Sequence, residues 1–556
     1  MLYKHSRKLI AGLAFILMLT PLAGCTTPGN SPSSGESTTL NIIARKPGNA
    51  LNPLEADSQT TYRVLELIYD TLLNIDKDGN LIPGLAESWD VSDDGLVYTL
   101  KIRANLKFSD GSPLTSEDVI YTMSRWRAGA LLSSQLSVVS SVEAVDKTTV
   151  KMTLSSPDRR VLDVLAHPGQ ASILSKAALE AASNEDEYFA KPTATSGGWT
   201  LEEYREDDKA ILVANPHYWN PVKIDKIVYT FAADSIAWVA ALESGTADLA
   251  FPIAGVNVAH LKGNPDFVFH MNAGQPSFIM WLANWQEFPL NDVRVRQAIA
   301  YMLPRETAVD VCWGGAATAS GGSLIPPGNW ARSEGHDPYL VSESEAIQKA
   351  SDLLSSAGWV EAANGMRVSK GITGVNDGTS LAAEIYFTPD YVQAKCAAQL
   401  AKNSLAGVGF DLQLRESEWN AFEDRFNSAA WGEWATGGKV GTPPSADMDM
   451  LVSSLGMPTY EDTVQVTFHS QGWINPYYCK YDNPQVDAWI DEARSSSDLD
   501  VVKELYGKVQ DAINEDLPCF VTGHQMDIKL ATSKLQGFWA RPDSSNKALY
   551  ESTLNK

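Results

Sequence analysis

The chain has 556 residues, 44% of them hydrophobic and 20% charged, an ordinary composition for a globular protein of several domains. Lys and Arg number 44 against 68 Asp and Glu, so the formal net charge is −24. This acidity argues against nucleic acid as the main partner and leaves no basic patch for anionic lipid. The 16 Trp, 19 Tyr and 16 Phe suit either thick packing or a ligand cleft with stacking walls.

Residues 1–24 are predicted to be a secretory signal. A basic start is followed by an apolar run over residues 9–19, which is too short to cross ~30 Å of hydrocarbon comfortably as a membrane anchor. The sequence Leu22-Ala23-Gly24-Cys25 resembles the bacterial lipobox, which implies cleavage before Cys25 and lipidation of its thiol. Residues 25–39 are rich in Ser, Thr, Gly and Pro and are predicted to form a flexible tether.

Four further cysteines lie in the expected folded part, at Cys312, Cys396, Cys479 and Cys519. In an exported protein they allow two disulfides with three possible pairings, and buried thiols are equally compatible with the sequence.

The N-terminal part is predicted to form strands and tight turns. Residues 39–43 are β-rich, and Asp-Gly pairs at 78–79, 94–95 and 110–111 are strong turn signals. Apolar and polar residues alternate over residues 98–103, which predicts a half-buried strand.

Capping residues predict several helices. Thr115, with Asp118 three positions later, predicts a helix over residues 116–127, and Ser342, with Glu345, predicts one that ends at Ala357. The other predicted elements are a helix capped by Asp292, a helix from Asp390 to Ala406, a helix over residues 502–513, and strands at 227–231, 383–387 and 410–414. Helices that alternate with short strands indicate an α/β protein.

The motifs of common enzymes are missing from the sequence. It contains no His-Glu-x-x-His, Gly-x-Ser-x-Gly, P-loop or dinucleotide-binding glycine pattern, so we expect no enzyme, no cofactor and no metal site. Asp76, Asp78 and Asn80 match only half of a calcium loop and are better explained by a hairpin turn. His217 and His524 are interpreted as surface or core residues.

A long run of residues resembles the signature of family 5 extracellular solute-binding proteins, the oligopeptide, dipeptide and nickel receptors of bacterial ABC importers. The signature extends over residues 83–103 and 106–119, including Ser109-Asp110-Gly111 and Glu117-Asp118-Val119. Further blocks follow in the order expected for that family: residues 196–201, 215–219, 242–249, Asn284, 289–299, 353–358 and 481–484 with Asp487.

This resemblance implies an α/β fold of the periplasmic-binding-protein type (type II, cluster C), with two lobes around a hinge cleft plus an extra lobe. The expected ranges are 40–70, 193–286 and 521–556 for lobe I, 71–192 for the extra lobe II, and 287–520 for lobe III. It also implies that a ligand stabilises a closed arrangement that the permease distinguishes.

The ligand class is less clear from the sequence. Peptide receptors of this family usually place an Asp shortly after a Gly-Trp pair to hold the ligand's α-ammonium group, and Gly437 stands at that position here. Glu433 and Asp447 are the nearby acids that could take over the role. Peptide is therefore the leading ligand class, and an oligosaccharide or another polar solute is the alternative.

The candidate ligand-binding residues are mostly aromatic, because flat rings suit sugars and apolar side chains. Trp434 and Trp285 are the strongest candidates for the cleft wall, Asn284 and Tyr62 for polar contacts, and Gly198 for close approach of the backbone to a ligand. The remaining aromatic candidates are Trp281, Trp419, Phe422, Trp431 and Trp473.

Together these features predict a lipid-anchored, monomeric substrate-binding protein on the extracytoplasmic face of the membrane, in the periplasm or at the cell surface. Its partners would be ABC permease subunits with cytoplasmic ATPases, with the lipid anchor as its only membrane contact and with no nucleic acid. A solute-sensing receptor without a transport role is the third interpretation.

Overall fold

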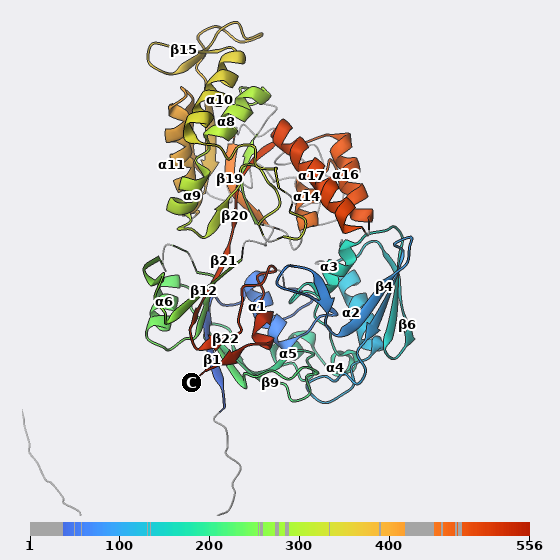
Figure 1. The fold of residues 1–556 in the computed structure, drawn as a ribbon. Helices are drawn as coiled ribbons and strands as arrows, with labels where there is room; N and C mark the ends of the chain where they lie inside the picture. The colour runs from blue at the N-terminus through green and yellow to red at the C-terminus, as the bar shows by residue number, and fades with distance from the viewer. Residues whose placement is uncertain are drawn as a thin grey trace, which may run out of the picture. The chain divides into compact units, whose positions relative to one another are not determined.

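Thr38–Lys556 form one compact unit in the computed structural model (Figure 1). The structure describes residues 37–555 except for residues 49, 57, 130–131, 134, 254, 256–258, 273–276, 284–287, 328, 333, 389–390, 418–449, 457–459, 473–474, 476–480 and 497. Across these described ranges, no helix combines the length and the apolar character that a membrane span needs.

A seven-stranded sheet holds the first part of the chain together with its C-terminal part. Its order is β12-β21-β11-β1-β10-β9-β8. The strands are β1 (Thr39–Ala44), β8 (Trp199–Arg205), β9 (Lys209–Ala214), β10 (Lys226–Phe231), β11 (Leu249–Phe251), β12 (Phe267–Asn272) and β21 (Asp527–Thr532). β1 runs parallel to β10 and β11, and the remaining pairs are antiparallel. Helices α1 (Gln59–Ile68) and α6 (Ser235–Glu243) pack on this sheet.

A second, antiparallel sheet has four strands in the order β4-β5-β7-β6 and a hydrophobic core of its own. The strands are β4 (Ala86–Val91), β5 (Val97–Ile102), β6 (Val139–Asp146) and β7 (Thr149–Leu154). The nearby elements are the hairpin β2–β3 (Leu73–Ile75, Leu81–Pro83) and helices α2 (Ser116–Ala128), α3 (Arg160–Ala166), α4 (Lys176–Ala181) and α5 (Glu185–Ala190). We call this part the β4–β7 lobe.

Local sequence explains the elements of the β4–β7 lobe. β5 buries every second residue, as the alternation predicts, and Gly95 turns the chain between β4 and β5 with φ +66°. The N–H of Thr115 donates to Oδ2 of Asp118 at 2.9 Å, so the predicted cap of α2 is confirmed. Asp76 accepts from the N–H groups of Asp78 and Asn80 inside the β2–β3 turn, as expected for a hairpin.

The third sheet has six strands in the order β14-β20-β13-β19-β17-β18. The strands are β13 (Ser277–Ala283), β14 (Ala317–Ala319), β17 (Ala382–Phe387), β18 (Asp411–Glu416), β19 (Met450–Gly456) and β20 (Cys519–Gln525). The helices of this part are α8 (Val293–Met302), α9 (Arg305–Cys312), α10 (Glu343–Ser356) and α11 (Val392–Ala406), followed by α14 (Tyr460–Phe468), α16 (Pro484–Ser495) and α17 (Leu499–Asp516).

The helix predictions in this part are largely confirmed. Asp292 caps α8 and Ser342 caps α10, each through its side chain. For α11 the N-cap residue is Tyr391, and Asp390 lies outside the described residues. The buried stripe of α10 passes through Ala346, Ala350 and Leu354, and Ile347 beside it is 38% exposed.

The remaining short elements are the hairpin β15–β16 (Trp359–Glu361, Arg367–Ser369), the pair β22–β23 (Leu535–Gln536, Thr553–Leu554) and the 3-10 turns η1 (Ala259–Leu261) and η2 (Lys547–Tyr550). One disulfide joins α9 to α11, between Cys312 and Cys396. Cys519 is a buried thiol, and Cys479 lies outside the described residues.

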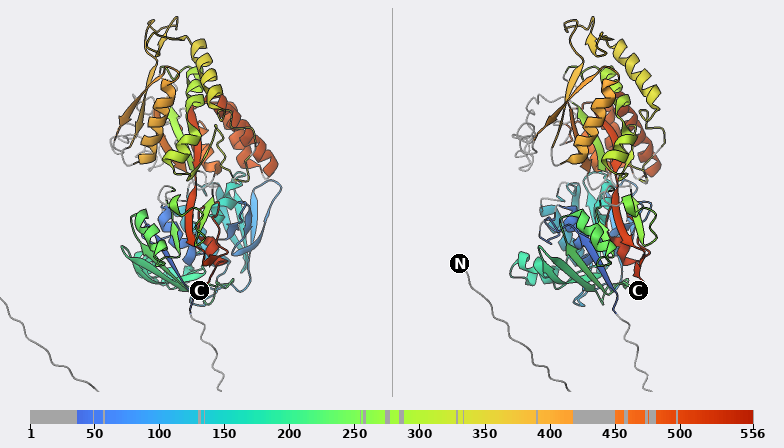
Figure 2. Two further views of the ribbon diagram at one scale, coloured as in Figure 1. Left: turned by 60° about the vertical axis from the view of Figure 1, so that its left-hand side comes forward. Right: turned by 90° about the vertical axis from the view of Figure 1, so that its left-hand side faces the viewer.

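The chain crosses between the two large sheets at β20 and β21, with only Met526 between these strands. The red strands in Figure 2 follow one another from sheet to sheet at this point. β12 and β13 lie in the same two sheets in the opposite order along the chain. β13 falls inside the range 193–286 expected for lobe I yet pairs with the six-stranded sheet, and the domain ranges themselves stay a prediction.

Candidate ligand site beside the sheet crossing

Three of the predicted ligand residues lie in the described part of the chain: Tyr62, Gly198 and Trp281. The other predicted residues lie outside it, namely Asn284, Trp285, Trp419, Phe422, Glu433, Trp434, Gly437 and Asp447, together with Trp431, Trp473 and the lipidation site Cys25. The surroundings of these three residues can therefore be described.

Tyr62 is half-buried on helix α1 and has two polar neighbours. Its hydroxyl donates to the carbonyl oxygen of Ala56 at 2.7 Å and accepts from Nε2 of Gln170 at 2.5 Å. The imidazole of His167 meets the Tyr62 ring edge-on, with 5.5 Å between the ring centroids. We call Tyr62, His167 and Gln170 the Tyr62 group.

Two polar side-chain atoms of the Tyr62 group are buried without a hydrogen bond to the described part of the chain. Oε1 of Gln170 and Nδ1 of His167 are buried, and neither has a hydrogen-bond partner within the described residues. Burial lowers the pKa of His167 to about 4, so its imidazole is neutral at pH 7. Since an unpartnered buried polar atom is costly, these atoms are suited to hydrogen bonds with an uncharged polar ligand group such as an amide.

Gly169 allows the loop that carries Gln170 to pack closely against Tyr62. Its φ is +82°, and a Cβ at this position would lie 2.7 Å from Cβ of Tyr62 and 2.8 Å from its Cα. Only glycine satisfies both the backbone conformation and the close approach. The loop between α3 and α4 is thereby pressed against α1.

Helix α1 is also joined to the strand that crosses between the sheets. Nη2 of Arg63 lies 2.9 Å from Oδ1 of Asp527, and both side chains are 3% exposed. Asp527 opens β21 directly after Met526, and Arg63 follows Tyr62. The Tyr62 group is therefore fixed, through one helix, to the crossing.

A cluster of buried charges surrounds this ion pair. Nζ of Lys529 donates to the carbonyl oxygen of Ser544 at 2.8 Å and to Oδ1 of Asn546 at 2.9 Å, and it lies 3.5 Å from Oδ2 of Asp527. Oε1 of Glu66 accepts from the N–H of Asn546 at 2.5 Å. We call Arg63, Glu66, Asp527, Lys529 and Asn546 the hinge cluster.

Burial shifts the titration of two members of the hinge cluster. It raises the pKa of Glu66 to about 7, against the opposing charge of Lys529. It lowers the pKa of Lys529 to about 8, against the opposing charge of Asp527. The hydrogen bonds and ion pairs of the hinge cluster therefore depend on the protonation of Glu66 and Lys529, which changes close to neutral pH.

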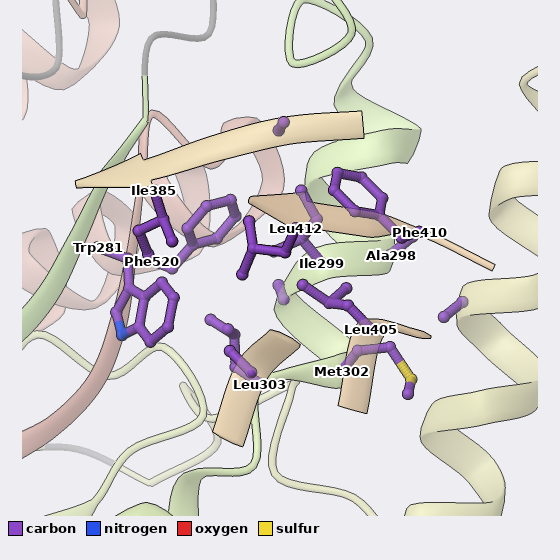
Figure 3. Close-up of a cluster of buried hydrophobic side chains, with 14 of the residues drawn as sticks. Trp281, Ala298, Ile299, Met302, Leu303, Ile385, Leu405, Phe410, Leu412 and Phe520 are labelled. Carbon is purple, nitrogen blue, oxygen red and sulfur yellow. The ribbon is translucent and has the colours of Figure 1, made fainter. Parts of the chain in front are cut away.

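Trp281 belongs to the hydrophobic core of the six-stranded sheet. It is 3% exposed, and Figure 3 shows it among Leu303, Ile385 and Phe520. β13 is an inner strand of that sheet, and Trp281 packs in the core that this sheet shares with α8 and α11. The structure thus places Trp281 in this core, and a ligand contact of Trp281 stays a prediction.

The backbone of Gly198 lies close to neighbouring protein side chains and not at an open surface. Its N–H donates to the hydroxyl of Tyr550 at 3.2 Å. A Cβ here would lie 2.7 Å from Cε1 of Tyr550 and 2.8 Å from Cγ1 of Val222. The C-terminal turn, which carries Tyr550, accounts for the glycine.

The sequence-based expectations missed His167 and Gln170. The Pro168-Gly169 dipeptide is a turn signal, but nothing local to it points to Tyr62, which lies 108 residues from Gln170. Within the described residues there is no group of three His, Cys, Asp or Glu side chains that could hold a metal ion.

The comparisons with known proteins agree with this architecture. Residues 80–459 match the model of the family described as bacterial extracellular solute-binding proteins, family 5 Middle. The glutathione-binding protein GsiB of Escherichia coli O1:K1 / APEC is 28% identical over 507 residues, which cover 89% of this chain and 90% of GsiB.

Solved structures resemble the fold at lower sequence identity. HbpA2 from Haemophilus parasuis matches with a TM-score of 0.78 and 21% identity, over 93% of this chain and 100% of HbpA2. The ABC transporter-associated periplasmic binding protein DppA from Helicobacter pylori, in complex with peptide STSA, matches with a TM-score of 0.68 and 23% identity, over 94% of this chain and 98% of DppA.

Proposed function

Because the chain belongs to family 5 of the bacterial extracellular solute-binding proteins, we propose that it is a lipid-anchored receptor that captures peptides and delivers them to an ABC importer. Family 5 proteins work with ABC permeases and ATPases, and they bind solutes without transforming them. The fold supports this role, since two large sheets are connected by short crossings about which a cleft can close.

The Tyr62 group carries the proposal for a peptide ligand. Gln170 offers a buried amide oxygen, and Tyr62 holds the amide of Gln170 in place through a hydrogen bond of 2.5 Å. A backbone N–H of a peptide is the complementary donor, because both groups are neutral and fixed in direction. GsiB is named for glutathione, itself a small peptide, and DppA holds peptide STSA, which supports the same ligand class.

An oligosaccharide or another polar solute is the second candidate. Gly437 stands where peptide receptors of the family usually carry the Asp for the ligand's ammonium group, and the tryptophan-rich segments could stack on sugar rings. Glu433 or Asp447 would have to replace that Asp if the ligand is a free peptide.

A thermal-shift screen separates these two ligand classes. Peptides of two to five residues and neutral oligosaccharides would be added to the purified chain without its signal and tether. A true ligand at about 100 times its Kd adds about 2.7 kcal/mol to the free energy of unfolding, which moves the melting temperature measurably. Stabilisation by peptides alone supports the proposal, and stabilisation by oligosaccharides alone overturns the peptide assignment.

The membrane anchor rests on Cys25 and the polar tether that follows it. Lipidation would hold a monomeric receptor on the extracytoplasmic face, within reach of its permease. Cys25→Ser should release the protein or leave its signal uncleaved, as membrane fractionation and mass determination would show. A processed mutant that stays in the membrane fraction would contradict lipid anchoring.

A further inference from the structure

A contact joins the β4–β7 lobe to the helices of the six-stranded-sheet part, far from the β20–β21 crossing in sequence. Asp158, in the loop before α3, contacts Arg494, near the C-terminal end of α16. The two residues are 336 positions apart in the chain. The contact is carried by Asp158, Arg159, Arg160, Trp330 and Arg494, which we call the latch.

Asp158 is the centre of the latch. It is 2% exposed, and its carboxylate accepts from Nε of Arg160 at 2.9 Å and from Nη2 of Arg160 at 2.6 Å. Arg160 lies in the same lobe as Asp158, so this pairing fixes the position of the Asp158 carboxylate independently of the other lobe. Nη2 of Arg494, on α16, adds a further bond to Oδ2 of Asp158 at 3.3 Å.

Two neighbouring contacts reinforce the bond between Arg494 and Asp158. The backbone N–H of Arg159 donates to the carbonyl oxygen of Arg494 at 3.1 Å. The guanidinium of Arg159 lies 4.9 Å from the ring centroid of Trp330, which packs against the core of α14, α16 and α17. A backbone bond, an ion pair and a cation–π contact thus meet at one place.

The Asp158 carboxylate is ionised, as an ion pair with Arg494 requires. Burial alone would raise its pKa, but the hydrogen bonds and charge of Arg160, together with the charge of Arg494, hold the pKa of Asp158 below its ordinary value. The carboxylate therefore stays ionised across the physiological range. Arg494 meets a fixed anion when the lobes approach.

We propose that the latch holds α16 against the loop before α3 and so favours this approach of the β4–β7 lobe to the six-stranded-sheet part over a more open arrangement. The inference rests on the proposed function in that closure serves ligand capture. A contact that forms in the closed arrangement and breaks in the open one shifts the equilibrium by its own free energy, whatever solute occupies the cleft. The β4–β7 lobe would then set how long a ligand is retained.

The test uses Arg494→Met in the ligand-free protein. This variant removes the bond from α16 but leaves Asp158 paired with Arg160, so it buries no unpaired carboxylate. Arg125→Met is the matched control, because it removes an ion pair with Glu185 that lies wholly inside the β4–β7 lobe. Trp330→Leu is the second latch variant, since it takes away the aromatic ring without changing a charge.

Two measurements read the latch directly. Hydrogen exchange should become about tenfold faster for the peptide that includes the Arg159 N–H in Arg494→Met and Trp330→Leu. Small-angle scattering should show a larger radius of gyration for both variants, while Arg125→Met matches the wild type in both measurements. Circular dichroism and urea unfolding confirm that the variants are folded.

The opposite outcomes overturn the latch. The contact does not hold the lobes together if hydrogen exchange and scattering are unchanged in both latch variants. The same conclusion follows if exchange becomes faster without an increase in the radius of gyration, or if Arg125→Met expands as much as the latch variants do. These measurements need no solute, so they fail or succeed independently of the peptide screen. Absence of peptide binding in a wild type with an intact latch counts against the proposed function alone.

Discussion

Arg63 and Asp527 form an ion pair of 2.9 Å inside the protein, and they lie 464 positions apart in the chain. Arg63 follows Tyr62 on α1, and Asp527 opens the strand that has just crossed between the two large sheets. A buried ion pair therefore connects the helix that carries Tyr62 to the strand that crosses between the two large sheets.

Loss of this ion pair should destabilise the protein strongly. Asp527→Asn leaves the Arg63 guanidinium buried without its counter-ion, and removal of one partner of such a pair typically costs about 3–5 kcal/mol. Lys46→Met is the matched control, because the pair between Lys46 and Asp207 is exposed to solvent and contributes little. Urea unfolding should give a clearly lower midpoint for Asp527→Asn only, and equal midpoints for the two variants would refute the role of the pair.

Glu66 makes the stability depend on pH. Burial raises its folded pKa to about 7 from an ordinary value of 4.5, so between these pH values the folded protein keeps a proton that the unfolded chain has lost. The free energy of unfolding should therefore fall as the pH rises through this window, by at most about 1.4 kcal/mol per pH unit. Glu66→Gln should flatten that part of the melting-temperature profile.

The control for the pH profile is Glu551→Gln, which changes an exposed carboxyl near the C-terminus. It should keep the slope of the wild type. If Glu66→Gln also keeps the slope between pH 4.5 and 7, the protonation assigned to Glu66 is wrong.

Gly169 can be tested against a glycine with the same backbone conformation. Gly79 has φ +84° and no atom within 4 Å of the place that a Cβ would take, whereas Gly169 has φ +82° and Tyr62 at 2.7 Å. Gly79→Ala should cost only the left-handed conformation, about 1–2 kcal/mol. Gly169→Ala should cost more and should also weaken ligand binding, because Tyr62 must move; equal costs and unchanged affinity would separate Gly169 from the site.

The disulfide between Cys312 and Cys396 should stabilise the six-stranded-sheet part. It closes a loop between residues 84 positions apart, and disulfides of this kind typically contribute about 2–4 kcal/mol. The double variant Cys312→Ala/Cys396→Ala should unfold at lower urea concentration than the wild type. A reductant should shift the wild type toward the variant and leave the variant unchanged; a shift in both would point to another disulfide.

Much of the fold was predictable because its signals are local. Thr115 and Asp118 act within one turn of helix, Ser342 needs only Glu345 nearby, and alternation along residues 98–103 reports directly on β5. Burial within a helix is less local: on α10 Ala346 is buried and the adjacent Ile347 is 38% exposed, because the neighbouring elements decide which face is covered.

The candidate site was less predictable because its contacts are distant in sequence. An aromatic residue carries no mark of whether it faces a core or a cleft, and the inner position of β13 places Trp281 in the core. Gly198 carried a real signal of close approach, but the partner is Tyr550, 352 positions away. Gln170 meets Tyr62 only after the chain folds, so no spacing rule could have found the pair.

The most direct test of a peptide receptor is titration calorimetry with one short peptide, free and N-acetylated, on the wild type, Gln170→Leu, Glu433→Gln and Asp447→Asn. We predict saturable one-to-one binding of the free peptide, weakened by Gln170→Leu. We also predict a loss of more than about a hundredfold in affinity on acetylation and in one of the two acidic variants, since an unpaired buried ammonium costs several kcal/mol. No binding of any peptide, together with tight binding of an oligosaccharide that is abolished by Trp434→Ala, would contradict the account.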